Sequence, residues 1–454
     1  MTGKKPNVIV VLTDQQRWDT VGAHGNPMGL TPNFDRLAQS GAFIKNSFTC
    51  QPVCAPARSA FQTGLYPTTS GCYKNGIPLP RTLPTLATLF GDAGYATGYI
   101  GKWHLAENEP VPPEERGGYQ DWLAANLLEF VSGPFDTVLF DESGHRQKLP
   151  GYRVDALADA AIRYIDRRQD RPFFLFLSFL EPHHQNSTDS YPAPLGYEES
   201  LRDKLVVPTD LAQLGGSTLE HLPGYLGMVK RLDEALGRII EALHSLGILN
   251  DTIVLFTSDH GCHFKTRNDE YKRSSHEASI RVPTLFHGPA FDGLGTYDGL
   301  VSLIDLPPTL LDAAGVTVPA AMQGKSLLPA LRGERKGREG VLIQISEHHV
   351  GRALRTARWK YEVEAPELDG YAVPGAQVYV EARLYDLHSD PHELENLIRS
   401  RAHSGIREEL RSLLAAAMAE AGEAAPKIVT VEDAGWQERM ASRTLQRTIL
   451  ATSI

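Results

Sequence analysis

Two pairs of residues in this chain have the chemistry of metal ligands. Asp14 and Gln15 directly follow one apolar run of the sequence. Asp259 and His260 directly follow another. Two carboxylates, an amide oxygen and an imidazole form a mostly hard ligand set, which suits Ca²⁺, Mg²⁺ or Mn²⁺ better than a thiolate-rich zinc site would. Either aspartate alone could instead cap a helix or a loop, but capping does not explain all these residues together, so we predict a divalent metal site.

Cys54 is a candidate for chemistry at sulfur or at a group made from it. It begins the segment Cys-Ala-Pro-Ala-Arg58 and precedes a predicted helix, Ser59–Gly64. An anion there would meet free backbone N–H groups and the positive end of the helix dipole. A modified side chain, a thiolate of lowered pKa and an inert buried thiol are the alternatives. The remaining cysteines form neither a disulfide framework nor Cys-x-x-Cys zinc spacing: Cys50, Cys72 and Cys262.

Lysines and histidines that could bind an anion and move protons follow other apolar runs. Lys102 and His104 follow a short one, and His183 and His184 follow a longer one. A lysine ammonium offers a point charge to oxyanions, and histidine is the commonest general acid and base. One such residue in a loop would usually be solvent-exposed, so the prediction depends on several of them gathering in one place.

The apolar runs before these residues are predicted strands of a mostly parallel sheet that helices cover on both faces. Side chains just past the carboxyl ends of parallel strands gather at one edge of the sheet, where ligands bind. We therefore expect the metal ligands and the basic residues to lie together. The predicted strands are Val8–Leu12, Thr97–Ile100, Phe173–Leu180 and Thr252–Thr257.

Helical periodicity and a change in composition divide the rest of the chain. Helices are predicted from Thr31 to Gly41, from Val154 to Ile165 and from Met228 to Leu243. Beyond a charged connector at 333–340 we predict antiparallel strands and then a helix at 406–421; the strands are Val341–Ile345, Trp359–Val363 and Gln377–Arg383. The predicted domains are a catalytic domain at 1–335, a C-terminal subdomain at 336–422, and a tail at 423–454 that is a candidate homo-oligomer contact.

Overall composition excludes several classes of protein. The chain is 42% hydrophobic, which is enough for a large core. Its net charge of -10 argues against a nucleic-acid partner bound through phosphates. Val8–Leu12 is shorter than the roughly 7–15 residue core of a signal peptide, and no run approaches the roughly 18 residues of a membrane helix. We expect a cytoplasmic protein with no membrane partner.

These segments resemble the blocks of the type I (formylglycine-dependent) sulfatases, of the alkaline phosphatase superfamily. The most specific match is Cys54-Ala-Pro-Ala-Arg-Ser-Ala-Phe-Gln-Thr-Gly64, although Ala57 stands where serine is commonest. The resemblance implies an α/β fold: a large mixed, mostly parallel sheet flanked by helices, with a smaller α+β C-terminal subdomain. Further matching blocks occur in family order at Thr13–Gln16, Gly101–Leu105, Glu181–His184, Thr257–Gly261, Lys272–Pro283, Arg355–Tyr361 and Leu384–Leu397.

The resemblance also implies how the nucleophile forms and which residues bind the metal ion. Cys54 is oxidised to formylglycine by a formylglycine-generating enzyme, and the hydrate of this aldehyde attacks the sulfur atom of a sulfate monoester. Arg58 holds the hydrate and its helix in place. The metal, Ca²⁺ with Mn²⁺ or Mg²⁺ as alternatives, is bound by residue 54 together with Asp14, Gln15, Asp259 and His260.

Proton transfer and anion binding are implied for the remaining residues. Lys102 and Lys272 contact the sulfate oxygens. His183 or Lys272 protonates the departing alcohol, and His184 is a close rival of His183 for this role. His104 then takes the proton of the second hydroxyl, which expels sulfate and restores the aldehyde.

The predicted substrate is a small sulfate ester, either a sulfated carbohydrate or another small organic sulfate. The mouth of the pocket is also expected to include Gln185, Lys265, His348 and His349. The residues predicted to bind substrate carry ammonium, guanidinium or imidazole groups: Lys102, His183, His184, Lys272, His263 and Arg267.

Two rival functions share these motifs. A phosphonate monoester or phosphodiester hydrolase on the same scaffold is favoured by the Asp14-Gln15 and Asp259-His260 pattern, since many sulfatases carry Asp-Asp and Asp-Asn there. A non-catalytic, sugar-binding relative should have lost some motif residues, and none is missing here. Sulfate ester hydrolysis therefore remains the first prediction.

Overall fold

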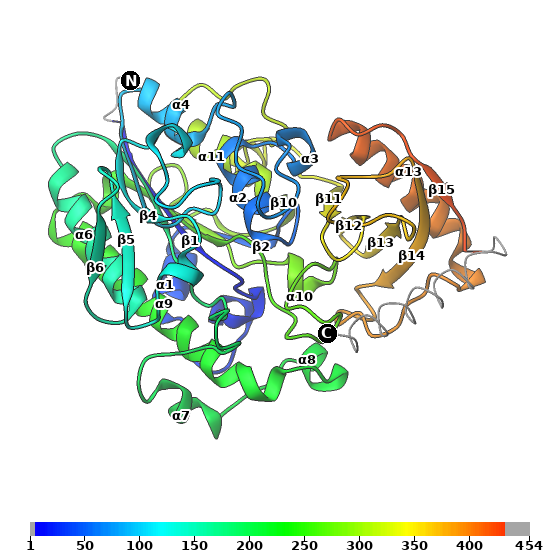
Figure 1. Ribbon diagram of the computed structural model, residues 1–454. Coiled ribbons are helices and arrows are strands. Elements are labelled where there is room, and N and C mark those ends of the chain that lie inside the picture. Colours follow the sequence, from blue (N-terminus) through cyan, green and yellow to red (C-terminus); the bar gives the residue numbers. More distant parts are fainter. Residues whose placement is uncertain (1–4, 432–454) are drawn as a thin grey trace. The chain divides into compact units, whose positions relative to one another are not determined.

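The computed structural model describes residues 5–431, and the chain divides into two compact units between Arg338 and Glu339 (Figure 1). Within the segment predicted as a tail, Lys427–Val429 forms a strand that pairs with the sheet of the second unit. Residues 432–454 and the oligomer contact predicted for the tail lie outside the described residues.

The first unit is built on a 10-stranded sheet in the order β10-β2-β9-β8-β1-β7-β3-β4-β5-β6. The run β8-β1-β7-β3-β4 is parallel, whereas β9, β5 and β6 pair antiparallel to their neighbours. The predicted mixed, mostly parallel sheet is thus confirmed. The strands are β1 Asn7–Thr13, β2 Ala42–Phe48, β3 Ala96–Lys102, β4 Asp121–Ala125, β5 Thr137–Asp141, β6 Arg146–Leu149, β7 Phe173–Ser178, β8 Thr252–Ser258, β9 Leu285–His287 and β10 Gly295–Ser302.

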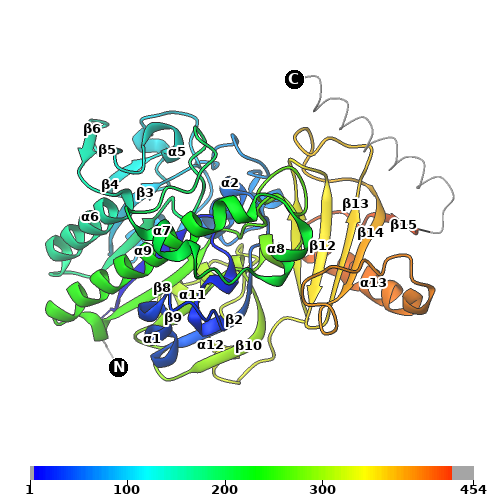
Figure 2. The same cartoon turned by 90° about the horizontal axis from the view of Figure 1, so that it is seen from below.

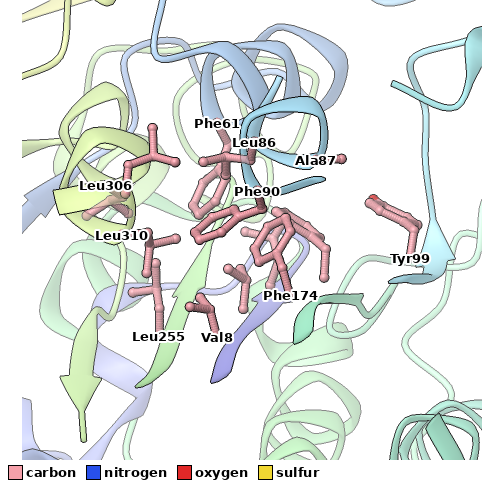
Figure 3. Packing of buried hydrophobic residues seen from close by; sticks show 14 of the residues in the cluster. Val8, Phe61, Leu86, Ala87, Phe90, Tyr99, Phe174, Leu255, Leu306 and Leu310 are labelled. Atoms are coloured by element: carbon pink, nitrogen blue, oxygen red, sulfur yellow. The ribbon is translucent and has the colours of Figure 1, made fainter. Parts of the chain in front are cut away.

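Helices cover both faces of this sheet, which explains why its central strands are continuously apolar. Alternate residues of β1 point to opposite faces. Val8 and Val10 pack in a core that includes residues of α2, α4 and α11 (Figure 3), whereas Ile9 and Val11 pack against α1, α6 and α9. Burying each such side chain stabilises the fold by about 1.5–3 kcal/mol. These helices are α1 Pro32–Ser40, α2 Cys54–Thr63, α4 Leu86–Asp92, α6 Arg153–Arg168, α9 Thr218–Ser245 and α11 Leu306–Ala313.

Short helices complete the first unit, and two sequence-based helix predictions need adjusting. The helix predicted from Met228 begins ten residues earlier, at Thr218, and contains Pro223; Figures 1 and 2 show it beside α6. The helix predicted from Ser59 begins at Cys54 itself. Pro56 falls at the third helical position, where its missing N–H removes no intrahelical hydrogen bond. The short helices are α3 Pro67–Ser70, α5 Leu128–Val131, α7 Tyr197–Arg202, α8 Thr209–Leu214, α10 Glu277–Ile280 and α12 Leu328–Leu331.

The second unit has a five-stranded sheet in the order β11-β12-β13-β14-β15 and the helix α13, Ser404–Glu420 (Figure 2). The strands are antiparallel except for β14 and β15. Within the described residues, no helix is long and apolar enough to cross a membrane. The strands are β11 Gly340–Ile345, β12 Gly351–Thr356, β13 Trp359–Glu364, β14 Val378–Asp386 and β15 Lys427–Val429.

Candidate active site

Several chemically reactive residues lie where neighbouring parallel strands end. Thr13 of β1 is opposite Ser258 of β8, and Gly101 of β3 is opposite Ser178 of β7. The residues that follow these positions therefore emerge at the same edge of the sheet. Gly101 is required here, because its φ is +107° and a Cβ atom would lie 1.9 Å from the Ser178 carbonyl oxygen. This close approach lets β3 deliver Lys102 beside the end of β7.

A group of potential metal ligands is buried at this edge. One ligand atom from each of Asp14, Cys54, Asp259 and His260 lies within 4.8 Å of the others. The Nδ1 atom of His260 is 3.0 Å from the carbonyl oxygen of Gly261, so Nδ1 carries the proton and Nε2 keeps a lone pair that could bind a metal ion. That Nε2 lies 3.6 Å from Asp14 Oδ1 and 3.6 Å from Asp259 Oδ1. These three side chains thus converge on one point.

Gln15 completes an oxygen-rich set. Its side chain is buried, and its Nε2 donates to the Tyr191 hydroxyl at 3.0 Å. Its Oε1 is buried with no hydrogen-bond partner, and Asp259 Oδ2 accepts no hydrogen bond either, although it forms an ion pair with Arg58. Buried acceptors without donors are costly unless a cation or water satisfies them. The donor set and the unsatisfied oxygens therefore fit a hard divalent cation.

Arg58 holds both carboxylates of this group. Its Nη2 donates to Asp14 Oδ2 at 3.0 Å, and its Nε lies 3.2 Å from Asp259 Oδ2. Burial acts to raise the pKa of Asp14, but Lys102 and Arg58 hold that pKa well below its usual range. Burial and the charge of Asp14 raise the pKa of Asp259 to about 6. A metal ion would oppose this rise, because it favours the ionised carboxylate.

Cys54 is the first residue of α2 and is buried among cations. Its Sγ atom lies 2.9 Å from Lys272 Nζ and 3.3 Å from His260 Nε2. Burial acts to raise the pKa of the thiol, but the charges of Lys102 and Lys272 lower it well below its usual value. A hydrogen bond with His104 adds to this effect. The surroundings of position 54 therefore stabilise an anion.

Lys102 and His104 lie beside a carboxylate that the sequence analysis missed. Lys102 Nζ, fully buried, donates to Asp14 Oδ2 at 2.8 Å and to Glu129 Oε1 at 3.0 Å. His104 Nδ1 lies 4.0 Å from the same oxygen of Glu129. Glu129 is on α5, four residues past the end of β4, which is parallel to β3. The strand-end rule could have found it, had β4 been recognised as a strand.

Lys272 and His183 form a hydrogen-bonded pair next to Cys54. The Nδ1 atom of His183 is 2.7 Å from the carbonyl oxygen of His184. That nitrogen must carry the proton, so Nε2 accepts from Lys272 Nζ at 3.2 Å. Burial and Lys272 lower the pKa of His183, which favours the neutral ring. His184 instead stacks on His183, with ring centroids 4.3 Å apart, and lies tilted against Tyr271, with ring centroids 4.5 Å apart.

The other residues predicted to bind substrate do not all lie beside Cys54. His263 is fully buried, and its Nε2 donates to the Lys272 carbonyl oxygen at 2.9 Å, so it fixes the backbone of Lys272. Burial lowers its pKa to about 4. Arg267 is half-buried on the following loop. Gln185 is buried, and its Nε2 donates to the Glu129 carbonyl oxygen at 2.7 Å. His348 and His349 belong to the second unit.

Comparison with known protein families identifies matches along most of the chain. A family model described as "Sulfatase" matches residues 6–316. A second model, "N-sulphoglucosamine sulphohydrolase, C-terminal", matches residues 269–420. Together they cover the strand-end site and most of the second unit.

Individual relatives are similar over nearly their whole length. An ulvan-active sulfatase of Formosa agariphila is 28% identical, with 92% of this chain and 82% of that protein covered. An N-acetylglucosamine-6-O-sulfatase of Bacteroides thetaiotaomicron is 25% identical, with coverage of 90% and 86%. The crystal structure of a putative sulfatase from Bacteroides fragilis has a TM-score of 0.82 at 25% identity, covering 93% and 97%.

A phosphonate monoester hydrolase of Agrobacterium radiobacter shares the fold. Its crystal structure has a TM-score of 0.67 at 22% identity, with 92% of this chain and 96% of that chain covered. At this identity the likeness concerns the fold alone. The sulfatase matches are closer in both sequence and structure, as expected from the sequence motifs.

Proposed function

This chain belongs to the sulfatase family and is a sulfuric ester hydrolase, and we propose that its nucleophile is a formylglycine made from Cys54 by a formylglycine-generating enzyme. The observation that carries this proposal is the position of Cys54 at the start of α2, with Sγ 2.9 Å from Lys272 Nζ and 3.3 Å from His260 Nε2. A nucleophile at this position has potential metal ligands and an ammonium group within reach. A bound metal ion and an ammonium group would both reduce the repulsion between an anionic ester and an oxygen nucleophile at this position.

We propose that the buried strand-end ligands hold a divalent cation, with Ca²⁺ favoured over Mn²⁺ or Mg²⁺ because every ligand except the imidazole is an oxygen. The cation and the hydrated aldehyde together would supply a hydroxyl nucleophile of lowered pKa. Arg58 orients two of the carboxylates through Nη2 and Nε. The proposed ligands are Asp14, Gln15, residue 54, Asp259 and His260.

Lys102 and Lys272 are proposed to bind the sulfate group. Both ammonium groups are buried and lie near position 54, Lys272 through its contact with Sγ and Lys102 through its contact with Asp14. In a site shielded from water, fixed positive charges stabilise the negative charge of the transition state more strongly than they could in bulk solvent. Because the charges are already in place, no reorganisation is needed during the reaction.

Lys272 is proposed to give its proton to the departing alcohol oxygen. His183 Nε2 accepts from Lys272 Nζ, and His183 Nδ1 donates to the His184 carbonyl oxygen. This chain of hydrogen bonds orients the ammonium group and leaves His183 as its acceptor. The contacts thus support His183, rather than His184, as the histidine next to the leaving group.

His104 is proposed to be the base that restores the aldehyde. Its backbone has a φ of +60°, and its N–H donates to the Asn126 carbonyl oxygen at 2.9 Å. A non-glycine residue in the left-handed region is costly and is retained where its position matters. Its side chain takes part in a hydrogen bond with Cys54, so it is in reach of a hydroxyl at that position.

We propose a sulfated saccharide as the substrate. The name of the N-acetylglucosamine-6-O-sulfatase relative supports this class. So does the polar and aromatic cluster beside His184: Tyr271 Oη donates to Asp189 Oδ1 at 2.8 Å, and Lys265 Nζ donates to Asp189 Oδ2 at 2.8 Å. Such groups suit sugar hydroxyls and ring faces. A marked preference for aryl or choline sulfate over every sulfated saccharide tested would contradict this assignment.

A phosphonate monoester or phosphodiester activity is the second candidate, favoured by Gln15 and His260 in the metal-ligand set. Turnover of 4-nitrophenyl sulfate should exceed that of an aryl phosphonate monoester and an aryl phosphodiester. The opposite ranking would make the phosphoryl ester the main substrate. Substitution Cys54→Ala should abolish sulfate ester turnover while leaving the melting temperature close to wild type. Turnover that survives in Cys54→Ala would place the nucleophile elsewhere.

A further inference from the structure

Glu129 is a buried carboxylate at the active site, and the proposed reaction gives it no role. Its side chain is on α5 and only 4% exposed. Within its carboxylate, Oε1 accepts from Lys102 Nζ at 3.0 Å, whereas Oε2 is buried with no hydrogen-bond partner. Lys102 and, more weakly, His104 lower the pKa of Glu129 to about 2, although burial alone would raise it. The carboxylate is thus ionised and has one acceptor atom uncommitted.

His104 has the matching unsatisfied donor. Its Nδ1 atom is buried, has no hydrogen-bond partner, and lies 4.0 Å from Glu129 Oε1. The His104 side chain also takes part in a hydrogen bond with Cys54. Catalytic hydrogen bonds are often long in a substrate-free structure and shorten when substrate binds. His104 Nδ1, a nitrogen without a partner, therefore lies 4.0 Å from Oε1 of a carboxylate whose other oxygen, Oε2, has no donor.

The backbone around both residues is held rigidly. The Gln185 side chain donates to the Glu129 carbonyl oxygen at 2.7 Å. The N–H of His104 donates to the Asn126 carbonyl oxygen at 2.9 Å, which ties the histidine to the end of β4. Because β4 leads directly into α5, the same segment fixes the imidazole and the carboxylate. Only the side chains need to move for the hydrogen bond to form.

We propose that Glu129 is a positioning residue, anchored by Lys102 through Oε1, that accepts the Nδ1–H of His104 and so presents His104 Nε2 as the base for residue 54. This inference rests on the proposed function. In the step concerned, His104 Nε2 takes the proton of a hydroxyl on residue 54, the electron pair of that O–H bond forms the C=O bond, and the C–O bond to sulfate breaks with its pair leaving on sulfate. Glu129 stabilises the resulting imidazolium. A carboxylate behind an imidazole fixes the tautomer and raises the basicity of the ring.

The kinetic test uses the mature, aldehyde-containing enzyme and 4-nitrophenyl sulfate. Glu129→Gln keeps an oxygen for Lys102 but removes the charge, so kcat should fall by about 10–100-fold with a smaller change in KM. Because only the second half of the reaction is slowed, the first turnover should still release 4-nitrophenol as a rapid burst, with inorganic sulfate released slowly. Wild-type kcat in Glu129→Gln would overturn the proposal, and so would loss of the burst together with kcat.

Glu109→Gln is the matched control. Glu109 Oε2 accepts from the backbone N–H groups of Asn126 and Leu127 at 2.6 Å and 3.2 Å, so it supports the same segment without touching Lys102 or His104. Glu109→Gln should lower the melting temperature without producing a burst of 4-nitrophenol. His104→Ala separates the two levels of inference. If His104→Ala gives a burst and Glu129→Gln does not, the role of Glu129 is wrong; if neither gives a burst, the role of His104 is wrong as well.

A readout independent of turnover is the tautomer of His104. In the mature, aldehyde-containing enzyme, ¹⁵N NMR of histidine-labelled protein, assigned with His104→Ala, should show the proton on Nδ1. Glu129→Gln should shift the population toward the Nε2–H tautomer, and Glu129→Asp should give an intermediate result. An Nε2–H tautomer in the wild-type protein would overturn the proposal even if Glu129→Gln proved too unstable for kinetics.

Discussion

The Nζ atom of Lys272 lies 2.9 Å from the Sγ atom of Cys54, although 218 residues separate them in the chain. His263 and His183 hold this lysine from two sides, through its backbone carbonyl and its side chain. Because the ammonium group contacts both position 54 and His183, it lies where a leaving group would depart from an ester attacked at residue 54.

Lys272→Ala should slow substrates with poor leaving groups more than those with good ones. A general acid contributes about 10²–10⁴-fold to rate when the leaving group needs its proton, and 4-nitrophenolate needs it least. The comparison is kcat/KM for 4-nitrophenyl sulfate against an alkyl or saccharide sulfate. Lys148→Ala, which removes a 66% exposed side chain paired with Asp136, should change neither. An equal loss on all substrates would mean that Lys272 binds sulfate without donating a proton.

Arg58→Met should be among the most destabilising substitutions in the first unit. It leaves the buried carboxylates of Asp14 and Asp259 without their shared cation, at a cost of about 3–5 kcal/mol. The matched control is Arg358→Met, since Arg358 is 59% exposed and pairs with Asp386 at 2.7 Å. Loss of an exposed pair costs about 0–1 kcal/mol. Thermal unfolding in excess metal chelator measures both, and similar melting temperatures for the two variants would contradict the account.

Metal binding should stabilise the protein through Asp14, Gln15, Asp259 and His260. A ligand at 100 times its Kd adds about 2.7 kcal/mol to stability. A chelator should therefore lower the melting temperature, and Ca²⁺ should restore it at lower concentration than Mn²⁺ or Mg²⁺. Gln15→Leu should weaken this response. If chelation and readdition leave the melting temperature of the wild-type protein unchanged, the strand-end group is not a metal site.

A second buried histidine–carboxylate group supplies the control for metal binding. His349, Glu362 and Glu364 offer ligand atoms within 4.8 Å of one another. Arg383 donates to carboxylate oxygens of both glutamates, so its guanidinium group already supplies the positive charge that a metal ion would bring. His349→Gln should consequently leave the response to metal unchanged. A reduced response would mean that part of the stabilisation comes from the second unit.

Asp233 should make stability depend on pH in the mildly acidic range. It accepts from the backbone N–H groups of Asn33 and Phe34 at the start of α1, yet burial raises its pKa from 3.8 to about 6. The folded state therefore binds this proton more tightly than the unfolded state, and the stabilising contribution present below pH 3.8 is lost as pH rises through about 6. Relative to Asp233→Asn, the wild-type melting temperature should fall over this range; parallel profiles would contradict the pKa.

The strand-end residues could be predicted from sequence because each follows a strand buried on both faces. Because β1 and β7 are almost continuously apolar, the sequence shows where each strand ends and which polar residues follow it. β4 was not recognised, since Asp121 and Trp122 break its apolar pattern, and Glu129 was missed with it. Likewise β12 carries Arg352 and Arg355, which are buried through ion pairs and other contacts that no local pattern reveals.

Side-chain environment was harder to predict than position. His263 has the residue type of a substrate ligand but is buried against the Lys272 carbonyl oxygen. Gln185 is likewise buried, and its side chain donates a hydrogen bond to the Glu129 carbonyl oxygen of α5 instead of being exposed at the surface. Both roles depend on contacts between segments far apart in sequence. Motif spacing therefore predicted the residues that the structure brings together at the strand ends, whereas the contacts that orient them required the fold.

The most direct test of the central claim measures aldehyde content and turnover on the same samples. Protein made with graded amounts of a formylglycine-generating enzyme would be digested with trypsin, and the peptide Asn46–Arg58 weighed by mass spectrometry. Turnover of 4-nitrophenyl sulfate should rise in proportion to the fraction of peptide carrying the aldehyde at position 54, and should extrapolate to zero in its absence. Full turnover in samples whose residue 54 is entirely the thiol would contradict it.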